Sequence, residues 1–142
     1  MTQVYFYSGA SNKLQTACRL CAKAVQQKSM KVLIYAPDTA MLEQLDELLW
    51  TFSPTSFIPH CTIRADSKLI RATPVILSDR IPADLPFDVL LNLDLQQPPS
   101  FDQFDRLIEI ADTSPEGKQA ARARYRFYKE ADYPIQHFNL DD

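Results

Sequence analysis

The sequence predicts an α/β fold in which a largely parallel sheet is flanked by helices. Short apolar or β-branched runs alternate along the chain with segments that carry apolar residues at helical spacing. The run at 31–36, Lys-Val-Leu-Ile-Tyr-Ala, is apolar at nearly every position, which is typical of a strand covered on both faces of a parallel sheet. The 142 residues are enough for a sizeable core, so we expect a single domain over 1–142.

Four other segments have the composition of strands. They are 4–7, 73–77, 88–93 and 134–140, the last being either a terminal strand or an extended tail. The loop between the second and third of them carries Pro82 and Pro86. We expect 51–72 to be irregular, because Pro54 and Pro59 interrupt any helix there.

Four helices are predicted, at 11–28, 38–50, 101–111 and from about 115 onward. Ser11 and Asp38 are suitable N-caps, and Pro115 suits a first helical turn. The third helix follows the proline pair at 98–99, and its predicted apolar stripe consists of Phe101, Phe104, Leu107, Ile108 and Ala111.

Glycine is scarce, and this excludes several kinds of site. Only Gly9 and Gly117 occur, so neither a G-x-G-x-x-G loop nor a G-x-x-x-x-G-K-[ST] phosphate loop can be written. Cys18 and Cys21 share the apolar stripe of the first helix, and we expect them to pack in the core rather than act in redox chemistry or bind zinc. The sequence therefore predicts no cofactor, no metal site and no catalytic residue.

The composition also bears on location. No apolar run approaches the roughly 20 residues of a membrane span, and the first residues lack the pattern of a signal peptide. Three cysteines, an odd number, indicate a reducing compartment. We expect a cytoplasmic protein with no membrane partner.

The segment 118–129 is a cationic anomaly in an acidic chain. It holds five Lys or Arg residues and no acid, whereas the whole chain has a net charge of −3. At about 100° per residue, a helix places Lys118, Arg122, Tyr125, Arg126 and Lys129 on one side. The opposite side, expected to face the core, carries Ala120, Ala123 and Phe127. A solvated helix face and a docking site for an anionic peptide are the two interpretations.

A second candidate surface is aromatic. Trp50 and Phe52 lie at the end of the second predicted helix, and Phe57 lies in the proline-broken loop that follows. These rings either cap the core or form an exposed patch of the kind that anchors protein interfaces.

Three segments together resemble the chi subunits of bacterial DNA polymerase III holoenzyme. They are Leu45-Asp-Glu-Leu-Leu-Trp50, Ser56-Phe-Ile-Pro-His60 and the cationic segment 118–129. The likeness spans nearly the whole chain and is poorest over 61–88. It implies a non-catalytic, Rossmann-like clamp-loader subunit that links the acidic C-terminal tail of single-stranded DNA-binding protein to the replisome through the psi subunit.

The resemblance also implies roles for individual residues. Lys118, Arg122, Tyr125 and Arg126 would bind the tail, with Ala111 as an apolar wall. Trp50 and Phe57 would face the psi subunit. Nucleic acid would then be contacted indirectly.

Two alternatives stay open at this point. A direct single-stranded nucleic-acid binder would stack bases on Tyr125, Phe127 and Tyr128 beside the cations. A small α/β enzyme is the other, and the scarcity of glycine argues against it.

Overall fold

The computed structural model describes residues 1–53, 57–83 and 87–140. Within them, seven parallel strands form one sheet in the order β3-β4-β2-β5-β6-β1-β7. The prediction of a parallel α/β fold is thus confirmed. Pro54, Ser56 and Pro86, which entered the sequence argument, lie outside the described residues. The strands are β1 (Gln3–Ala10), β2 (Val32–Tyr35), β3 (His60–Thr62), β4 (Val75–Ser78), β5 (Val89–Asn92), β6 (Arg106–Asp112) and β7 (Ile135–Asn139).

The four described α-helices begin at capping side chains. The Asp38 and Ser114 side chains accept hydrogen bonds from the backbone N–H groups of Ala40 and Gly117, and Pro115 follows in the first turn as expected. The first helix is capped by Asn12 and not by the predicted Ser11. The helices are α1 (Lys13–Lys28), α2 (Thr39–Thr51), α3 (Ser67–Ala72), the 3₁₀ turn η1 (Phe101–Gln103) and α4 (Pro115–Glu130).

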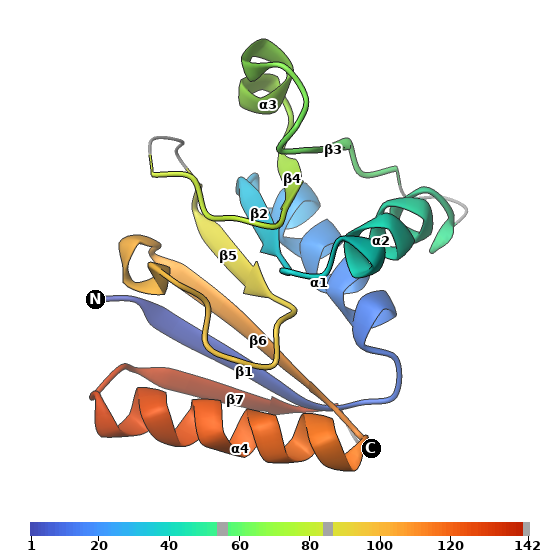
Figure 1. Ribbon diagram of the computed structural model, residues 1–142. Helices are drawn as coiled ribbons and strands as arrows, with labels where there is room; N and C mark the ends of the chain where they lie inside the picture. The colour runs from blue at the N-terminus through green and yellow to red at the C-terminus, as the bar shows by residue number, and fades with distance from the viewer. Residues whose placement is uncertain (54–56, 84–86, 141–142) are drawn as a thin grey trace.

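Helices cover both faces of the sheet (Figure 1). Residues of α1 and α2 pack in one hydrophobic cluster with one set of strand side chains, such as Val32 and Ile34. Residues of α3 and α4 pack in a second cluster with the alternate set, such as Leu33 and Tyr35. The short strand β2 is therefore buried along its whole length, as the apolar run at 31–36 predicted.

Two expectations about local structure are wrong. The predicted helix at 101–111 is instead η1 followed by β6. Leu107, Ile108 and Ala111 are buried because β6 lies between β5 and β1 and is covered on both faces. A fully buried strand has apolar residues at consecutive positions, which also satisfy helical spacing. The region 51–72, expected to be irregular, contains β3 and α3.

The expected burial of the two neighbouring cysteines is confirmed. Cys18 and Cys21 are fully buried in the cluster under α1 and α2. Burial raises the pKa of Cys18 to about 12 and also raises that of Cys21, so both thiols stay protonated at neutral pH. None of the described helices is long and apolar enough to cross a membrane.

Candidate functional site

A pocket of about 340 Å³ lies between α4 and the carboxyl ends of β1, β6 and β7. Four of the five residues assigned to tail binding line it: Lys118, Arg122 and Tyr125 from α4, and Ala111 from β6. The fifth, Arg126, is exposed on α4 outside this lining. The structure thus brings together residues that are separated in sequence by the turn between β6 and α4.

Tyr125 forms an aromatic wall of the pocket with residues from the sheet. Its ring packs edge-on against Phe6 of β1, at 5.4 Å between centroids, and lies 6.2 Å from the ring of His137 in β7. His137 is held in place by a hydrogen bond of 2.7 Å between its Nε2 and Ser8 Oγ. Phe6, Ser8 and His137 were not predicted from sequence, because their contribution depends on the pairing of β1 with β7.

The pocket has a positive rim and one acid. The side chains of Lys118 and Arg122 are exposed on α4, and Lys118 lies near the N-terminal end of the helix, where the helix dipole also favours anions. The acid is Asp112, whose Oδ1 accepts hydrogen bonds from Ser114 N at 3.1 Å and Ser114 Oγ at 2.7 Å. These bonds hold the Asp112 carboxylate in the turn that leads into α4.

The rotation of α4 differs from the sequence prediction. Its buried side consists of Gly117, Ala121, Arg124 and Tyr128. Ala123 is exposed and Phe127 is 39% exposed, so the expected core face of Ala120, Ala123 and Phe127 is wrong. The helix is rotated because Arg124 is buried. Charged residues are mostly exposed, so nothing in the sequence indicated that this arginine would face the sheet, where it pairs with an acid.

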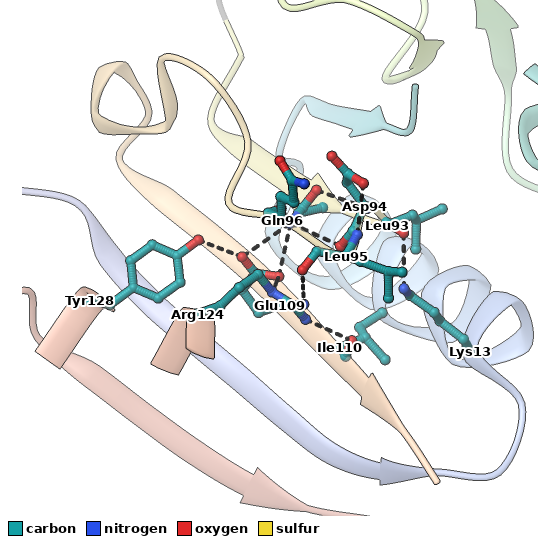
Figure 2. A network of polar contacts seen from close by, with 10 residues as sticks. Lys13, Leu93, Asp94, Leu95, Gln96, Glu109, Ile110, Arg124 and Tyr128 are labelled. Carbon is teal, nitrogen blue, oxygen red and sulfur yellow. Dashed lines mark hydrogen bonds and ion pairs between the residues drawn. The ribbon is translucent and has the colours of Figure 1, made fainter. Parts of the chain in front are cut away.

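Arg124 pairs with a buried acid in the centre of the sheet (Figure 2). Its Nε donates to Glu109 Oε1 at 2.9 Å, and its two terminal nitrogens donate to the carbonyls of Leu95 and Ile110. The Tyr128 hydroxyl donates to Glu109 Oε2 at 2.5 Å. Both α4 side chains therefore point into the sheet, and they fix which side of α4 faces outward.

The same network holds the loop that follows β5. Asn92 Nδ2 donates to both carboxylate oxygens of Glu109, at 3.0 and 3.1 Å, and to the carbonyl of Gln96 at 3.0 Å. Lys13 Nζ donates to the Leu93 carbonyl at 2.9 Å. Burial raises the pKa of Glu109, but every polar neighbour is a donor and the Arg124 charge opposes the rise. This arrangement suits the carboxylate form.

The second candidate surface was expected either to cap the core or to form an exposed aromatic patch, and its rings do both. Trp50 and Phe57 are 56% and 58% exposed, and their rings lie 5.1 Å apart. Phe52, in contrast, packs partly buried against the core under α1 and α2. The Trp50 ring also lies 4.8 Å from the buried His60 ring, whose Nε2 is 3.1 Å from Asp46 Oδ1. The His60 ring beneath the exposed patch is positioned by a hydrogen bond of 2.7 Å between its Nδ1 and the carbonyl of Ile58.

Fold and site together define a parallel α/β protein with a cationic pocket beside the edge strand of its sheet. Residues 1–136 match the family described as DNA polymerase III chi subunit, HolC. The chain belongs to this family. It is 38% identical to the DNA polymerase III subunit chi of Pseudomonas aeruginosa, over 99% of this chain and 98% of that protein. The subunit chi of Haemophilus influenzae is 29% identical over 79% of this chain and 76% of that protein.

Solved structures of low sequence identity share the fold. Domain 2 of the DEAD-box helicase Mss116p, solved bound to an RNA duplex, has a TM-score of 0.61 and 12% identity, and this chain spans 65% of that one. The C-terminal domain of the DEAD-box protein Dbp5 has a TM-score of 0.61 and 11% identity, with 92% of that chain covered. At this level of identity, the likeness concerns the arrangement of strands and helices alone.

Proposed function

We propose that this chain is a non-catalytic clamp-loader subunit of DNA polymerase III that binds the acidic C-terminal tail of single-stranded DNA-binding protein. It would link that protein to the replisome through the psi subunit. The observation that carries the proposal is the pocket beside α4, which combines Lys118, Arg122 and Tyr125 with the small wall residue Ala111.

The chemistry of the pocket matches an acidic peptide with an apolar end. Lys118 and Arg122 supply charge at the rim, and an arginine can bind a terminal carboxylate through two parallel hydrogen bonds. The Tyr125 ring, which is supported by the buried ring of Phe6, would supply apolar surface for the last side chain of the peptide. The pocket volume is near the lower limit of roughly 300–1,000 Å³ for small-ligand sites, so it would hold the end of a peptide.

Arg126 extends the cationic surface beyond the pocket. It is exposed on the same helix, four residues after Arg122, and so lies next to it on the helix surface. Acidic residues further from the peptide end would meet Arg126, with a contribution that is screened by salt. The loss of affinity on adding salt should therefore be smaller in Arg126→Gln than in the wild type.

Isothermal titration with the acidic tail peptide tests the proposal. Arg122→Glu should lose at least about tenfold in affinity, because it places a negative charge at the rim facing the peptide. Removing the last residue of the peptide should have a comparable effect on the wild-type protein. If Arg122→Glu binds as tightly as wild type, the assignment of the pocket is wrong.

Trp50→Ala is the matched control on the other candidate surface. Trp50 and Phe57 lie on α2 and the loop after it, away from the pocket lining, so Trp50→Ala should bind the tail peptide normally. It should weaken binding to a psi subunit, since exposed aromatic residues are frequent interface anchors. Unchanged psi binding by Trp50→Ala would contradict the second half of the proposal and leave the first half intact.

A further inference from the structure

A second groove lies on the opposite face of the sheet from the tail pocket. It has a volume of about 580 Å³ and runs between α1 and the strands β6, β1 and β7. Side chains alternate along a strand, so β1 and β7 contribute to both sites. Phe6 and His137 line the pocket beside α4, whereas Tyr5, Tyr7 and Phe138 line the groove.

The floor of the groove is a row of nearly parallel aromatic rings. The Tyr7 and Phe138 rings lie 4.8 Å apart at an interplanar angle of 16°, and Tyr5 and Phe138 lie 6.5 Å apart at 19°. The Arg106 guanidinium lies over the Tyr5 ring, 5.7 Å from its centroid. Phe138 is 38% exposed at the sheet edge, so the row is open to a ligand.

The rim of the groove is cationic on two sides. Lys23 and Lys28 are exposed on α1, and Arg106 lies across from them at the start of β6. None of the described residues that line the groove is acidic, although the chain as a whole has a net charge of −3. Positive charge is therefore concentrated around the aromatic row against the overall charge of the protein.

We propose that this groove binds single-stranded nucleic acid directly. Bases would continue the row of parallel rings, and phosphates would meet Lys23, Lys28 and Arg106, as in binding sites that combine an aromatic platform with a positive groove. The bases of a duplex are paired and stacked, so a single strand suits the aromatic floor better.

The helix α4 is a poorer place for such a ligand. Tyr128 is fully buried and Tyr125 packs edge-on against Phe6, which leaves Phe127 as the exposed ring in the segment 118–129. The proposal therefore concerns a different surface from the cationic helix. It is independent of tail binding, which uses the other side of β1 and β7.

Fluorescence anisotropy of a labelled oligothymidylate of about 15 nucleotides tests the proposal on the full chain. Wild type should bind, and binding should weaken steeply with added salt. Lys23→Glu/Lys28→Glu should lose at least about tenfold in affinity through charge. Phe138→Ala, which keeps every charge, should lose about tenfold through stacking.

The control is Lys68→Glu/Arg71→Glu, which makes the same charge change at exposed positions of α3. It should bind the oligonucleotide like wild type, and the groove variants should still bind the acidic tail peptide. The proposal is overturned if wild type does not bind, if a duplex binds equally well, or if Phe138→Ala has normal affinity. Equal losses in the control and the charge variant would also overturn it, because they indicate diffuse attraction.

Discussion

Glu109→Gln is the most direct test of how α4 is held against the sheet. Glu109 and Arg124 are 0% and 2% exposed and lie 2.9 Å apart. The substitution keeps the size of the side chain but leaves the Arg124 guanidinium buried without a counter-charge. An amide also cannot accept at both former oxygen positions, so it would face Asn92 or Tyr128 with a donor.

Breaking a buried pair by removing one partner typically costs about 3–5 kcal/mol, so we expect a loss of this size in the free energy of unfolding. Arg124→Met removes the other charge and should cost a similar amount. The double variant should lose less than the sum, by about 2 kcal/mol, because it leaves no buried charge unpaired. The difference between the double variant and the sum of the two single variants thus measures the charge interaction apart from the loss of packing.

Urea denaturation followed by circular dichroism measures these changes. Glu43→Gln makes the same chemical change at an exposed position of α2 and should stay within about 0.5 kcal/mol of wild type. Two results would refute the reasoning: a loss below about 1 kcal/mol for Glu109→Gln, or strictly additive effects in the double variant.

Two other predictions concern α1 and the start of α4. Burial raises the pKa of Cys18 from 9.0 to about 12, so the unfolded chain releases this proton in a window where the folded chain keeps it. The melting temperature should therefore fall as pH rises through this window, less steeply in Cys18→Ala, and equal slopes would contradict the prediction. Gly117→Ala would place a Cβ 1.9 Å from Asp112 Oδ1 and 2.9 Å from Ser114 Oγ, disturbing the helix cap. It should lower stability by about 1 kcal/mol despite the better helix propensity of alanine, and a raised melting temperature would disprove this.

Local sequence patterns correctly predicted those strands that consist of an uninterrupted buried run, and two of the helix starts. The strands β2, β4 and β5 are buried at every position, and Asp38 and Pro115 correctly marked the starts of two helices, whereas the cap of the first helix is Asn12 and not Ser11. β6 was missed because its apolar residues also satisfy helical spacing and because Glu109 interrupts the apolar run that would indicate a buried strand. Glu109 can be buried in the centre of the sheet because it pairs with Arg124, which lies 15 residues further along the chain in another element.

The candidate site was predictable to the extent that it lies on one helix. Lys118, Arg122 and Tyr125 share a side of α4 whatever the helix packs against. The rotation of α4 toward the core was not predictable, because it depends on the buried pair. The contributions of Phe6 and His137 require the register of β1 with β7, which joins the two ends of the chain.

That register has a consequence for folding during synthesis. β1 lies between β6 and β7, with Gln3 opposite Arg106 and Val4 opposite Ile135. During synthesis β1 must therefore wait for strands more than 90 residues further along the chain before it gains either neighbour. Contacts so distant in sequence slow folding, because the loop entropy is lost before they form. The pocket beside α4 and the groove beside α1 share β1 and β7, so neither can be completed before β7 has been made and has paired with β1.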